Sequence, residues 1–420
     1  MRVLVYPHAM EIGGSQLNAV ELAAAVRDRG HEVLVFGEDG PLVDVVRDRG
    51  LEFVPRDPRA RRRPSSYAAA QLTRLAMGRR LDVVHGYEWP PGVEAFGGPR
   101  LRSGTAAVCT VMSMAVAPFL PRTMPLVVGT EELRAGAAAN GHRSVTLLEP
   151  PVDVEANSPA VSPAGFRAQH ELDPDVPLMV MVCRLVPELK LEGLLAACDA
   201  VGELVGSGVA VQLAVVGDGP ARDLVEEAAA KANAHAGRRA VVLTGLLVDP
   251  KPAYAAADVM LAMGGSALRG LAFGKPLVVQ GEHGYWELLT ASTQPTFLRQ
   301  GWYGVGSDAD GRAVGAGRLA GILTPLLADR DRWAELGALG RRLVVERFSL
   351  QAAAAVQERV YEAAANPIAQ PSRATLSADA ATMLIGLTSH KVRRRWQRWR
   401  GTVATDDFNA VAGRTPGGRR

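Results

Sequence analysis

The strongest constraint on the fold is an alternation of short β-rich runs with segments of helical period, which the chain shows in two blocks. In the first block, a run at residues 2–6 precedes a helix in which Leu17, Val20 and Ala24 share one face, and Gly30 follows that helix. Such alternation is typical of βαβ units and predicts a parallel sheet covered by helices. The strands expected in this block are 2–6, 32–36, 52–54, 82–85, 105–109, 126–128 and 144–147.

A second block of the same kind follows a segment that breaks the pattern. Pro150, Pro151, Pro159 and Pro163 lie in this segment, and proline interrupts helices and sheets. Because 420 residues exceed one ordinary core, we expect two doubly wound α/β domains, at 1–155 and 156–345. A helix at 346–365 and a tail at 366–420 should follow them. The strands expected in the second block are 178–183, 211–216, 240–243, 258–262 and 276–280.

Charge is nearly balanced over the whole chain but unevenly distributed along it. The 47 Lys and Arg residues exceed the 44 Asp and Glu residues by only three, which gives no indication of a nucleic-acid partner. The tail at 366–420 holds ten basic and three acidic side chains, and six of the basic ones lie at 391–400 with Trp396 and Trp399. Leu376, Ala380, Met383, Leu384 and Leu387 are spaced to form the apolar face of a helix in this tail. Two interpretations of the tail stay open: a solvated, partly disordered extension, or peripheral contact with the inner face of a membrane.

Cysteine use and hydropathy indicate a reduced, cytoplasmic protein. Cys109, Cys183 and Cys198 are an odd number without metal-ligand spacing, which favours free thiols. No secretion signal is recognisable at the start of the sequence. The longest uncharged stretch, 103–121, contains Gly and Pro and predicts a strand and a loop rather than a membrane span. Three scattered Asp-x-Asp pairs are expected to be turns, so we expect no metal cofactor.

Candidate ligand contacts follow the first predicted strand. Open parallel sheets bind ligands at the carboxyl ends of their strands, and two glycines in this loop allow a ligand to approach the backbone closely. The helix that begins there offers free N–H groups, although the spacing is not the GxGxxG of a nicotinamide-binding fold. The candidates in this loop are His8, Gly13, Gly14, Ser15 and Gln16. His85, which the pattern places at the tip of the strand 82–85, is a further candidate; a structural role is the alternative.

Two cations follow the first strand of the second block. Arg184 and Lys190 lie in a loop that leads into a helix, and a diphosphate requires such fixed positive charge together with free helix amides. Only five of the 47 basic residues are lysines, so Lys190 is an unusual choice in this chain; a solvated surface pair is the alternative. Lys275 precedes proline rather than Ser or Thr, which excludes a Walker-type ATPase. Further candidates at turns and helix starts are Gly217, Gly264, Gly265, Ser266 and Arg269.

In their joint order these segments resemble the retaining glycosyltransferases of family 4, over about residues 1–365. Each segment alone is weak evidence for the family, whereas their joint order makes the resemblance strong. It rests on Gly13-Gly14, Gly30-His31-Glu32-Val33, Asp82-Val83-Val84-His85, Pro151-Val152-Asp153, Arg184-Leu185-Val186-Pro187-Glu188 with Lys190, Val216-Gly217-Asp218-Gly219-Pro220, Ala257-Asp258-Val259, Gly274-Lys275-Pro276, and Val360-Tyr361 in the last helix.

The resemblance implies the GT-B architecture, in which two Rossmann-like parallel-sheet domains face a cleft and a C-terminal helix crosses back to the first domain. In that family the Arg and Lys hold the donor diphosphate and the histidine lies beside the donor sugar. Arg184, Lys190 and His85 are therefore the expected catalytic residues. The helix before the Gly-Lys-Pro segment holds phosphate and ribose, which points to Gly265 and Ser266. The first domain is expected to bind the acceptor.

The chain departs from the family pattern at the donor site. Two glutamates that usually stand eight positions apart before the Gly-Lys-Pro segment are replaced by Leu261 and Arg269. Losing one charge-assisted hydrogen bond costs about 1.5–3 kcal/mol, so we expect Glu282 or Glu287 to supply a substitute carboxylate. Arg269 is expected to add a guanidinium that binds phosphate. Leu189 is one extra residue between the Arg and Lys positions.

The expected function is that of a cytoplasmic, metal-independent, retaining hexosyltransferase that uses a nucleotide-sugar donor and a glycan, lipid-linked or small-molecule acceptor. The missing glutamates leave an alternative open, namely a nucleotide-sugar-binding or scaffold protein of impaired activity. A nucleotide-sugar epimerase is a third alternative. The sequence names neither the nucleobase, the sugar nor the acceptor, and it does not fix the oligomeric state.

Overall fold

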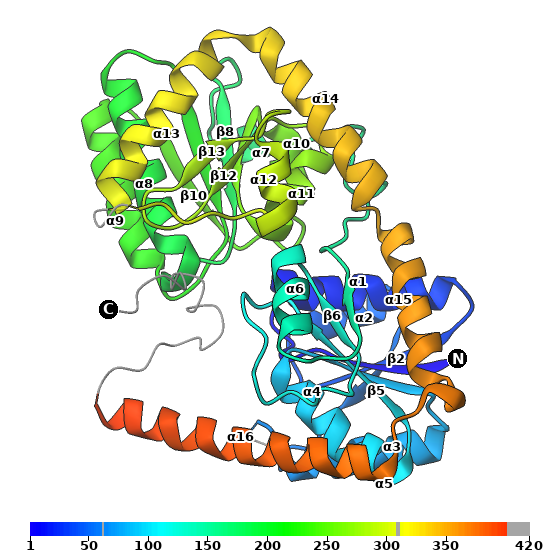
Figure 1. Ribbon diagram of the computed structural model, residues 1–420. Coiled ribbons are helices and arrows are strands. Elements are labelled where there is room, and N and C mark those ends of the chain that lie inside the picture. Colours follow the sequence, from blue (N-terminus) through cyan, green and yellow to red (C-terminus); the bar gives the residue numbers. More distant parts are fainter. Residues whose placement is uncertain (61–62, 308–310, 401–420) are drawn as a thin grey trace. The chain divides into compact units, whose positions relative to one another are not determined.

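The computed structural model describes residues 1–60, 63–307 and 311–400, which form two compact α/β units. Unit 1 comprises Met1–Pro151 and the chain from Leu350 onward, and unit 2 comprises Val152–Ser349 (Figure 1). The chain therefore leaves unit 1 after Pro151 and returns to it at Leu350. None of the described helices is both long enough and apolar enough to cross a bilayer.

Unit 1 contains a seven-stranded sheet with the order β3-β2-β1-β4-β5-β6-β7. All its strand pairs are parallel; Val5, for example, lies beside Val35 on one side and His85 on the other. The order changes direction between β1 and β4, which confirms the doubly wound architecture. The strands are β1 (Arg2–Tyr6), β2 (Glu32–Gly37), β3 (Glu52–Pro55), β4 (Val83–Tyr87), β5 (Ala106–Val111), β6 (Leu126–Val128) and β7 (Val145–Leu147).

Each face of this sheet carries its own core, because successive strand residues point to opposite faces. Val3 and Val5 pack in one core, and Leu4 and Tyr6 in the other. The first core is covered by α1 (Gly14–Asp28), α2 (Leu42–Asp48) and α15 (Leu350–Ala365). The second is covered by α3 (Ser66–Arg79), α4 (Trp89–Ala95), η1 (Phe96–Arg100) and α16 (Arg373–Trp399), and α5 (Leu101–Ser103) and α6 (Glu131–Ala139) complete the unit.

The last helices of the chain complete unit 1. As the resemblance implied, α15 returns to unit 1, where Tyr361 is buried in the core. The apolar helical face expected in the tail is formed by α16, which continues the fold of unit 1, except that Leu384 is exposed. Met383 and Leu387 are buried against the unit, and the carboxylate of Asp379 accepts hydrogen bonds from the amide and hydroxyl groups of Thr123, at 2.8 and 2.5 Å. Residues 401–420 lie outside the described part.

Unit 2 contains a six-stranded sheet with the order β10-β9-β8-β11-β12-β13. The first five strands are parallel, and β13 pairs antiparallel with β12. The strand β13 was not predicted, because it follows β12 after a short turn instead of a helix and so does not continue the alternation of strands and helices. The strands are β8 (Leu178–Val182), β9 (Gln212–Val216), β10 (Val241–Gly245), β11 (Val259–Ala262), β12 (Leu277–Gln280) and β13 (Trp286–Leu288).

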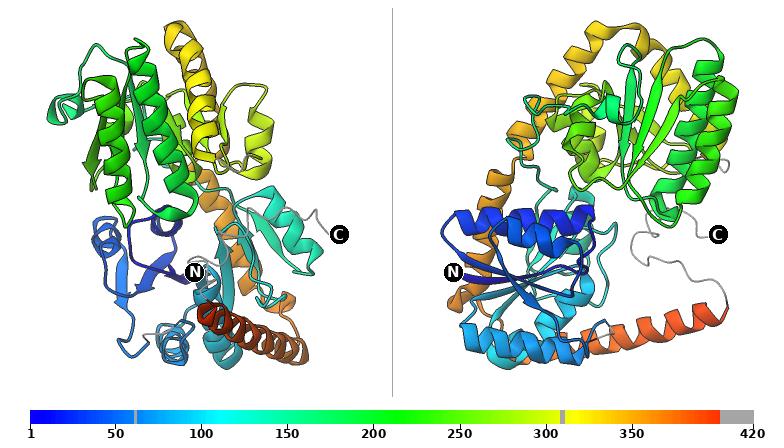
Figure 2. Two further views of the ribbon diagram at one scale, coloured as in Figure 1. Left: turned by 90° about the vertical axis from the view of Figure 1, so that its left-hand side faces the viewer. Right: turned by 180° about the vertical axis from the view of Figure 1, so that it is seen from behind.

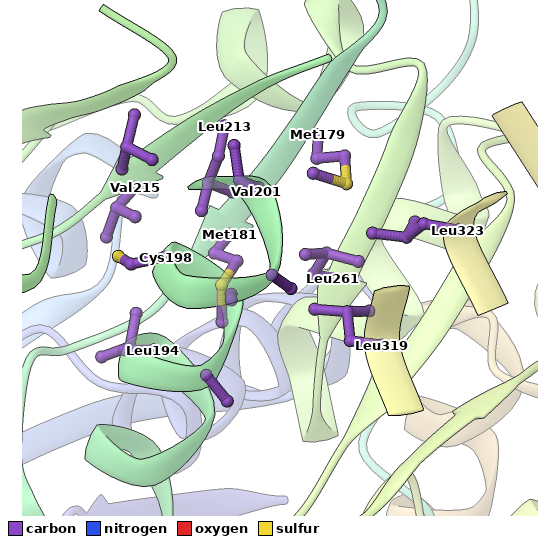
Figure 3. Packing of buried hydrophobic residues seen from close by; sticks show 14 of the residues in the cluster. Met179, Met181, Leu194, Cys198, Val201, Leu213, Val215, Leu261, Leu319 and Leu323 are labelled. Atoms are coloured by element: carbon purple, nitrogen blue, oxygen red, sulfur yellow. The ribbon is translucent and has the colours of Figure 1, made fainter. Parts of the chain in front are cut away.

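Helices cover both faces of this second sheet as well. Figure 3 shows one core, in which Met179 and Met181 of β8 pack with Leu194, Leu319 and other aliphatic side chains. The helices of that face are α8 (Pro187–Gly206), α9 (Arg222–Ala236) and α13 (Gly311–Ala328). The remaining helices are α7 (Phe166–Gln169), α10 (Lys251–Ala256), α11 (Gly264–Ala272), α12 (Gln294–Gln300) and α14 (Arg330–Arg347), several of which pack on the opposite face.

Candidate functional site

The candidate site of unit 2 lies at the carboxyl edge of its sheet, where the strand order changes direction. The chain runs from β8 to β9 on one side, whereas β11 pairs with β8 on the other side. The loops after β8 and β11 therefore diverge at a topological switch point, the place where open α/β sheets bind ligands. Arg184 follows β8, and Gly264 follows β11.

The loops after β8 and β9 are packed so closely that only glycine fits between them. Gly217 has a φ of +145°, and a Cβ atom there would lie 1.9 Å from the carbonyl oxygen of Cys183. A Cβ atom at Gly219 would lie 2.3 Å from the carbonyl oxygen of Leu185. The amide of Leu185 in turn donates a hydrogen bond of 3.0 Å to the carbonyl oxygen of Asp218. Gly217 thus fixes the backbone that carries Arg184.

A distortion at the start of α8 places Lys190 at the first regular turn of that helix. Glu188 has extended backbone angles, and Leu189 has a φ of +64°, which a side chain with a Cβ atom rarely adopts. Leu189 is the residue that the family resemblance marked as extra, so the chain accommodates it by a local kink. The regular helix, with its free N-terminal amides, consequently begins at Lys190.

Arg184 and Lys190 are cations without a partner in the part of the chain that the structure describes. Arg184 is exposed and Lys190 is half-buried, and neither side chain makes a hydrogen bond or an ion pair with any described residue. The other three lysines of this unit all have partners: Lys231 pairs with Glu227, Lys251 with Asp249, and Lys275 donates to the carbonyl oxygen of Ala255. Loss of water lowers the pKa of Lys190, while the nearby Cys183 opposes that change. An anion bound beside Lys190 would offset the free-energy cost of removing its ammonium group from water.

The start of α11 provides a second group of donors at the same edge. Gly264 has a φ of +55°, and Gly265 and Ser266 form the first turn of the helix. The hydroxyl of Ser266 lies 3.0 Å from the hydroxyl of Tyr254, whose ring stacks on Phe273. The guanidinium of Arg269 lies over Gly265, because a Cβ atom at that glycine would be 3.5 Å from the Nη1 atom.

The two candidate substitute glutamates have different surroundings. Glu282 follows β12 at the carboxyl edge, and its carboxylate accepts a hydrogen bond of 2.5 Å from the hydroxyl of Tyr303. Glu287 lies within β13, where its register partner is Val279 in the middle of β12, and Arg318 donates to it at 3.1 Å. Glu282 is therefore the better placed of the two for a ligand at this edge.

The loop after β1 in unit 1 has the geometry expected of a ligand loop. Gly13 precedes the first turn of α1, and Gly14 is exposed, with no atom within 4 Å of the position of a Cβ. The Nε2 atoms of Gln16 and His8 lie 3.3 Å apart. The hydroxyl of Ser15 is buried and has no hydrogen-bond partner among the described residues.

The expectation for His85 is wrong in its geometry. The strand β4 continues to Tyr87, so His85 lies in its middle rather than at its tip. The side chain is fully buried, and its ring nitrogens lie 2.7 Å from the hydroxyls of Tyr361 and Thr110. Burial lowers the pKa of His85 to about 3, so the ring is neutral at pH 7. His85 links β4 to β5 and α15 and presents no surface to a ligand.

Comparison with known families agrees with this architecture. The model of Glycosyltransferase Family 4 matches residues 12–127, and that of Glycosyl transferases group 1 matches residues 176–298, so the two together cover more than half of the chain. This chain is a family 4 glycosyltransferase. No curated protein matches its sequence.

Solved structures share the fold of this glycosyltransferase at low sequence identity. HepE from Anabaena, in complex with UDP, is 16% identical with a TM-score of 0.65, covering 86% of this chain and 100% of that chain. A glycosyltransferase from Rickettsia africae is 13% identical with a TM-score of 0.65, covering 87% and 99%. Sucrose-phosphate synthase from Thermosynechococcus elongatus is 17% identical with a TM-score of 0.64, covering 86% and 98%.

The sequence analysis missed three side chains of the glycosyltransferase at the carboxyl edges of the two sheets. The hydroxyls of Tyr254 and Tyr303 contact Ser266 and Glu282, which lie 12 and 21 positions away in the sequence. Glu88 follows β4 with a φ of +70°, and its carboxylate accepts hydrogen bonds from the backbone of Met112 and Ser113 after β5. Glu88 is polar and stands after a predicted strand, a signal too general to select it, and the two tyrosines have no such signal in the sequence.

The packing of Gly217 predicts the effect of a single methyl group. Gly217→Ala should lower the free energy of unfolding by at least about 1–3 kcal/mol, because the added Cβ meets a backbone carbonyl at an unfavourable φ. Gly317→Ala is the matched control, since that glycine lies in α13 with open space around it, and it should stabilise by about 0.5–1 kcal/mol. Urea denaturation measures both; equal stability of the two variants would contradict the packing argument.

Proposed function

We propose that this glycosyltransferase transfers a hexose from a nucleoside diphosphate donor held at the carboxyl edge of unit 2, with retention of anomeric configuration and without a metal cofactor. The observation that carries the proposal is the pair Arg184 and Lys190, two cations without a partner among the described residues, at the switch point of the sheet. Anabaena HepE has been crystallised with UDP and with UDP-glucose, which supports this class of donor.

The proposed reaction needs positive charge where the leaving group forms. A hydroxyl oxygen of the acceptor bonds to the anomeric carbon, while the bond from that carbon to the diphosphate oxygen breaks. The electron pair leaves with the diphosphate, and the hydroxyl proton is transferred to it. Arg184, Lys190 and the free amides at the start of α8 stabilise the charge that grows on the diphosphate. We assign these fixed cations the charge-stabilising role that a divalent metal fills in other transferases.

The rest of the donor site follows from the same edge. Gly264, Gly265 and Ser266 offer amides and a hydroxyl to a phosphate, and Arg269 adds a guanidinium. We assign recognition of the ribose or sugar hydroxyls to Glu282, which Tyr303 orients, in preference to Glu287. The acceptor is assigned to the loop after β1, with Ser15, Gln16 and His8, whereas His85 receives a structural role.

Acceptor dependence separates this proposal from its two alternatives. A transferase releases the nucleoside diphosphate from its donor only when an acceptor is supplied. An epimerase converts the sugar without an acceptor, and a scaffold protein binds the donor without converting it. Nucleotide release measured with a panel of glycan, lipid-linked and small-molecule acceptors therefore distinguishes the three.

Replacing either cation should abolish donor binding. A nucleoside diphosphate at 100 times its dissociation constant stabilises the folded protein by about 2.7 kcal/mol, which a thermal-shift assay detects. We expect at least one of ADP, GDP, UDP and dTDP to stabilise the wild type. Arg184→Ala and Lys190→Ala should lose that shift, and should lower turnover by about 10²–10³-fold each.

Two variants control for the loss of charge alone. Arg299 is exposed without a partner among the described residues, and Lys231 forms only an exposed pair with Glu227, so Arg299→Ala and Lys231→Ala should bind as the wild type does. A wild type that no nucleoside diphosphate stabilises would refute the proposed function. Wild-type binding by Arg184→Ala and Lys190→Ala would refute only their assigned role.

The helix α16 supports a second part of the proposal, because it carries apolar residues on two opposite sides. Met383 and Leu387 pack on unit 1. Ile385, Val392, Trp396 and Trp399 are 69%, 64%, 50% and 83% exposed, and at 3.6 residues per turn they share an arc of about 60° on the other side. The end of the helix that bears both tryptophans extends beyond the rest of unit 1 (Figures 1 and 2).

Basic side chains flank this exposed apolar stripe on both sides. Arg393 and Arg400 lie on one side, and Lys391 and Arg395 on the other. The only acidic residue of the helix, Asp379, is held by Thr123 near the opposite end. Tryptophan beside cations is the composition of helices that lie in the headgroup region of anionic membranes. We therefore propose that residues 385–400 dock this enzyme on the cytoplasmic face of a membrane, which favours a lipid-linked acceptor.

Vesicle binding tests this contact. Each basic residue near an anionic surface contributes about 1 kcal/mol, so the wild type should sediment with vesicles of phosphatidylcholine and phosphatidylglycerol and not with phosphatidylcholine alone. Replacing both Trp396 and Trp399 by Ser should weaken binding by at least about tenfold. Val248→Ser, which removes an apolar side chain that is 91% exposed in unit 2, is the control. Unchanged binding by the tryptophan variant would exclude this membrane contact.

A further inference from the structure

A cavity of about 690 Å³ opens in unit 1 at the edge of the sheet opposite to the proposed acceptor loop. It lies at the amino ends of β5, β6 and β7, where Ala106, Pro125 and Ser144 line it. Further walls come from η1, from α15 and from the connection between α15 and α16. This volume is typical of sites for small organic ligands. All lining residues belong to unit 1, so the cavity is complete within one unit.

Three arginines line this cavity, and none of the described residues that line it is acidic. Arg143 and Arg359 are exposed and make no side-chain hydrogen bond or ion pair with any described residue. The guanidinium of Arg100 donates a hydrogen bond of 3.2 Å to the carbonyl oxygen of Gly104. The cavity therefore concentrates positive charge that the described protein leaves uncompensated.

The surroundings of Arg100 favour an anion beside its guanidinium. Burial lowers the pKa of Arg100, and no carboxylate opposes this change. Arg312 in unit 2 shows the usual opposite case, in which the carboxylate of Asp199 raises the pKa of the arginine. A guanidinium that has lost water without gaining a carboxylate gains most from a bound anion.

The other walls offer hydroxyls and an apolar surface. The hydroxyls of Ser144 and Thr146 line the cavity without a hydrogen-bond partner among the described residues. Apolar side chains such as Val356 and Val360 form the wall contributed by α15. A ligand that fits these walls combines an anionic group with a less polar body.

The connection that closes the cavity is itself held in place. It contains η2 (Pro367–Ala369), and the side-chain amide of Gln370 donates hydrogen bonds to the carbonyl oxygens of Ala364 and Asn366, at 2.9 and 2.7 Å. Gln370 and Ser372 line the cavity. The segment that leads into α16 thus completes a preformed site.

We propose that this cavity binds a phosphate ester of metabolite size, with its phosphate on Arg100, Arg143 and Arg359 and its organic part against α15. Guanidinium groups match phosphate oxygens by paired, charge-assisted hydrogen bonds, which favours phosphate over a monocarboxylate. The site is concave and small, which favours a metabolite over an acidic protein segment. It is separate from the glycosyl-transfer site, and the inference does not depend on the proposed function.

Calorimetric titration of the full chain with phenyl phosphate tests the proposal. Inorganic phosphate and phenol serve as control ligands, because each contains only one of the two groups of phenyl phosphate. Phenyl phosphate should bind more tightly than inorganic phosphate, and phenol should not bind. The double variant Arg143→Ala/Arg359→Ala should raise the dissociation constant by at least about tenfold. Both residues are exposed without described partners, so circular dichroism should show an intact fold. Arg332→Ala, an exposed arginine of α14 outside the cavity, is the matched control.

The Lys190→Ala variant separates this cavity from the proposed donor site. Phenyl phosphate binding should persist in Lys190→Ala, and nucleoside diphosphate binding should persist in the double arginine variant. Loss of phenyl phosphate binding in Lys190→Ala, or its retention in the double arginine variant, would overturn the assignment. Equal weakening by Arg332→Ala would indicate a general effect of net charge and would also overturn the assignment. The absence of phenyl phosphate binding by the wild type would overturn it as well.

Discussion

The half-buried ammonium of Lys190 is the feature on which the account of unit 2 depends. A charge that has lost water without an ion pair is costly unless something outside the described protein compensates it. The fold accepts this cost at the switch point of the sheet, and other features of the loops there keep the charge in place. Gly217 lets the loops after β8 and β9 pack together, and Leu189 takes an unfavourable backbone conformation so that the regular helix begins at Lys190. Strain of this kind persists where function requires it.

The two units use their polar residues in opposite ways. In unit 1, His85 is neutral, fully buried and hydrogen-bonded at both nitrogens, so it contributes to the core rather than to chemistry. In unit 2, Arg184 and Lys190 have no described partner and stay available. In the sequence, His85, Arg184 and Lys190 gave the same kind of signal, namely a polar residue beside a predicted strand. Only the surrounding packing separates the structural histidine from the two available cations.

Much of the fold could be predicted from the sequence because the strands are apolar runs bounded by turn residues. The segments 2–6 and 126–128 were predicted with their observed bounds, and the other predicted strands within two residues at each end. The error at His85 arose because the end of β4 is set by pairing with β5, where Tyr87 lies beside Thr110, and such pairing is not visible locally. The contacts of Ser266 with Tyr254 and of Glu282 with Tyr303 join elements that the sequence separates, and the two-sided apolar character of α16 emerged only when its packed side was known.

The small number of lysines makes a direct test of the central claim feasible. Reductive methylation with ¹³C-formaldehyde would label the five lysines, and Lys190→Arg would identify the signal of Lys190 by NMR. Titration with pH should show a pKa for Lys190 below that of the exposed lysines, because it has lost water. Saturation with a nucleoside diphosphate should shift this signal and raise its pKa, while the signals of Lys231 and Lys391 stay unchanged. An unmoved Lys190 signal, in the presence of a nucleotide that demonstrably binds, would contradict the account.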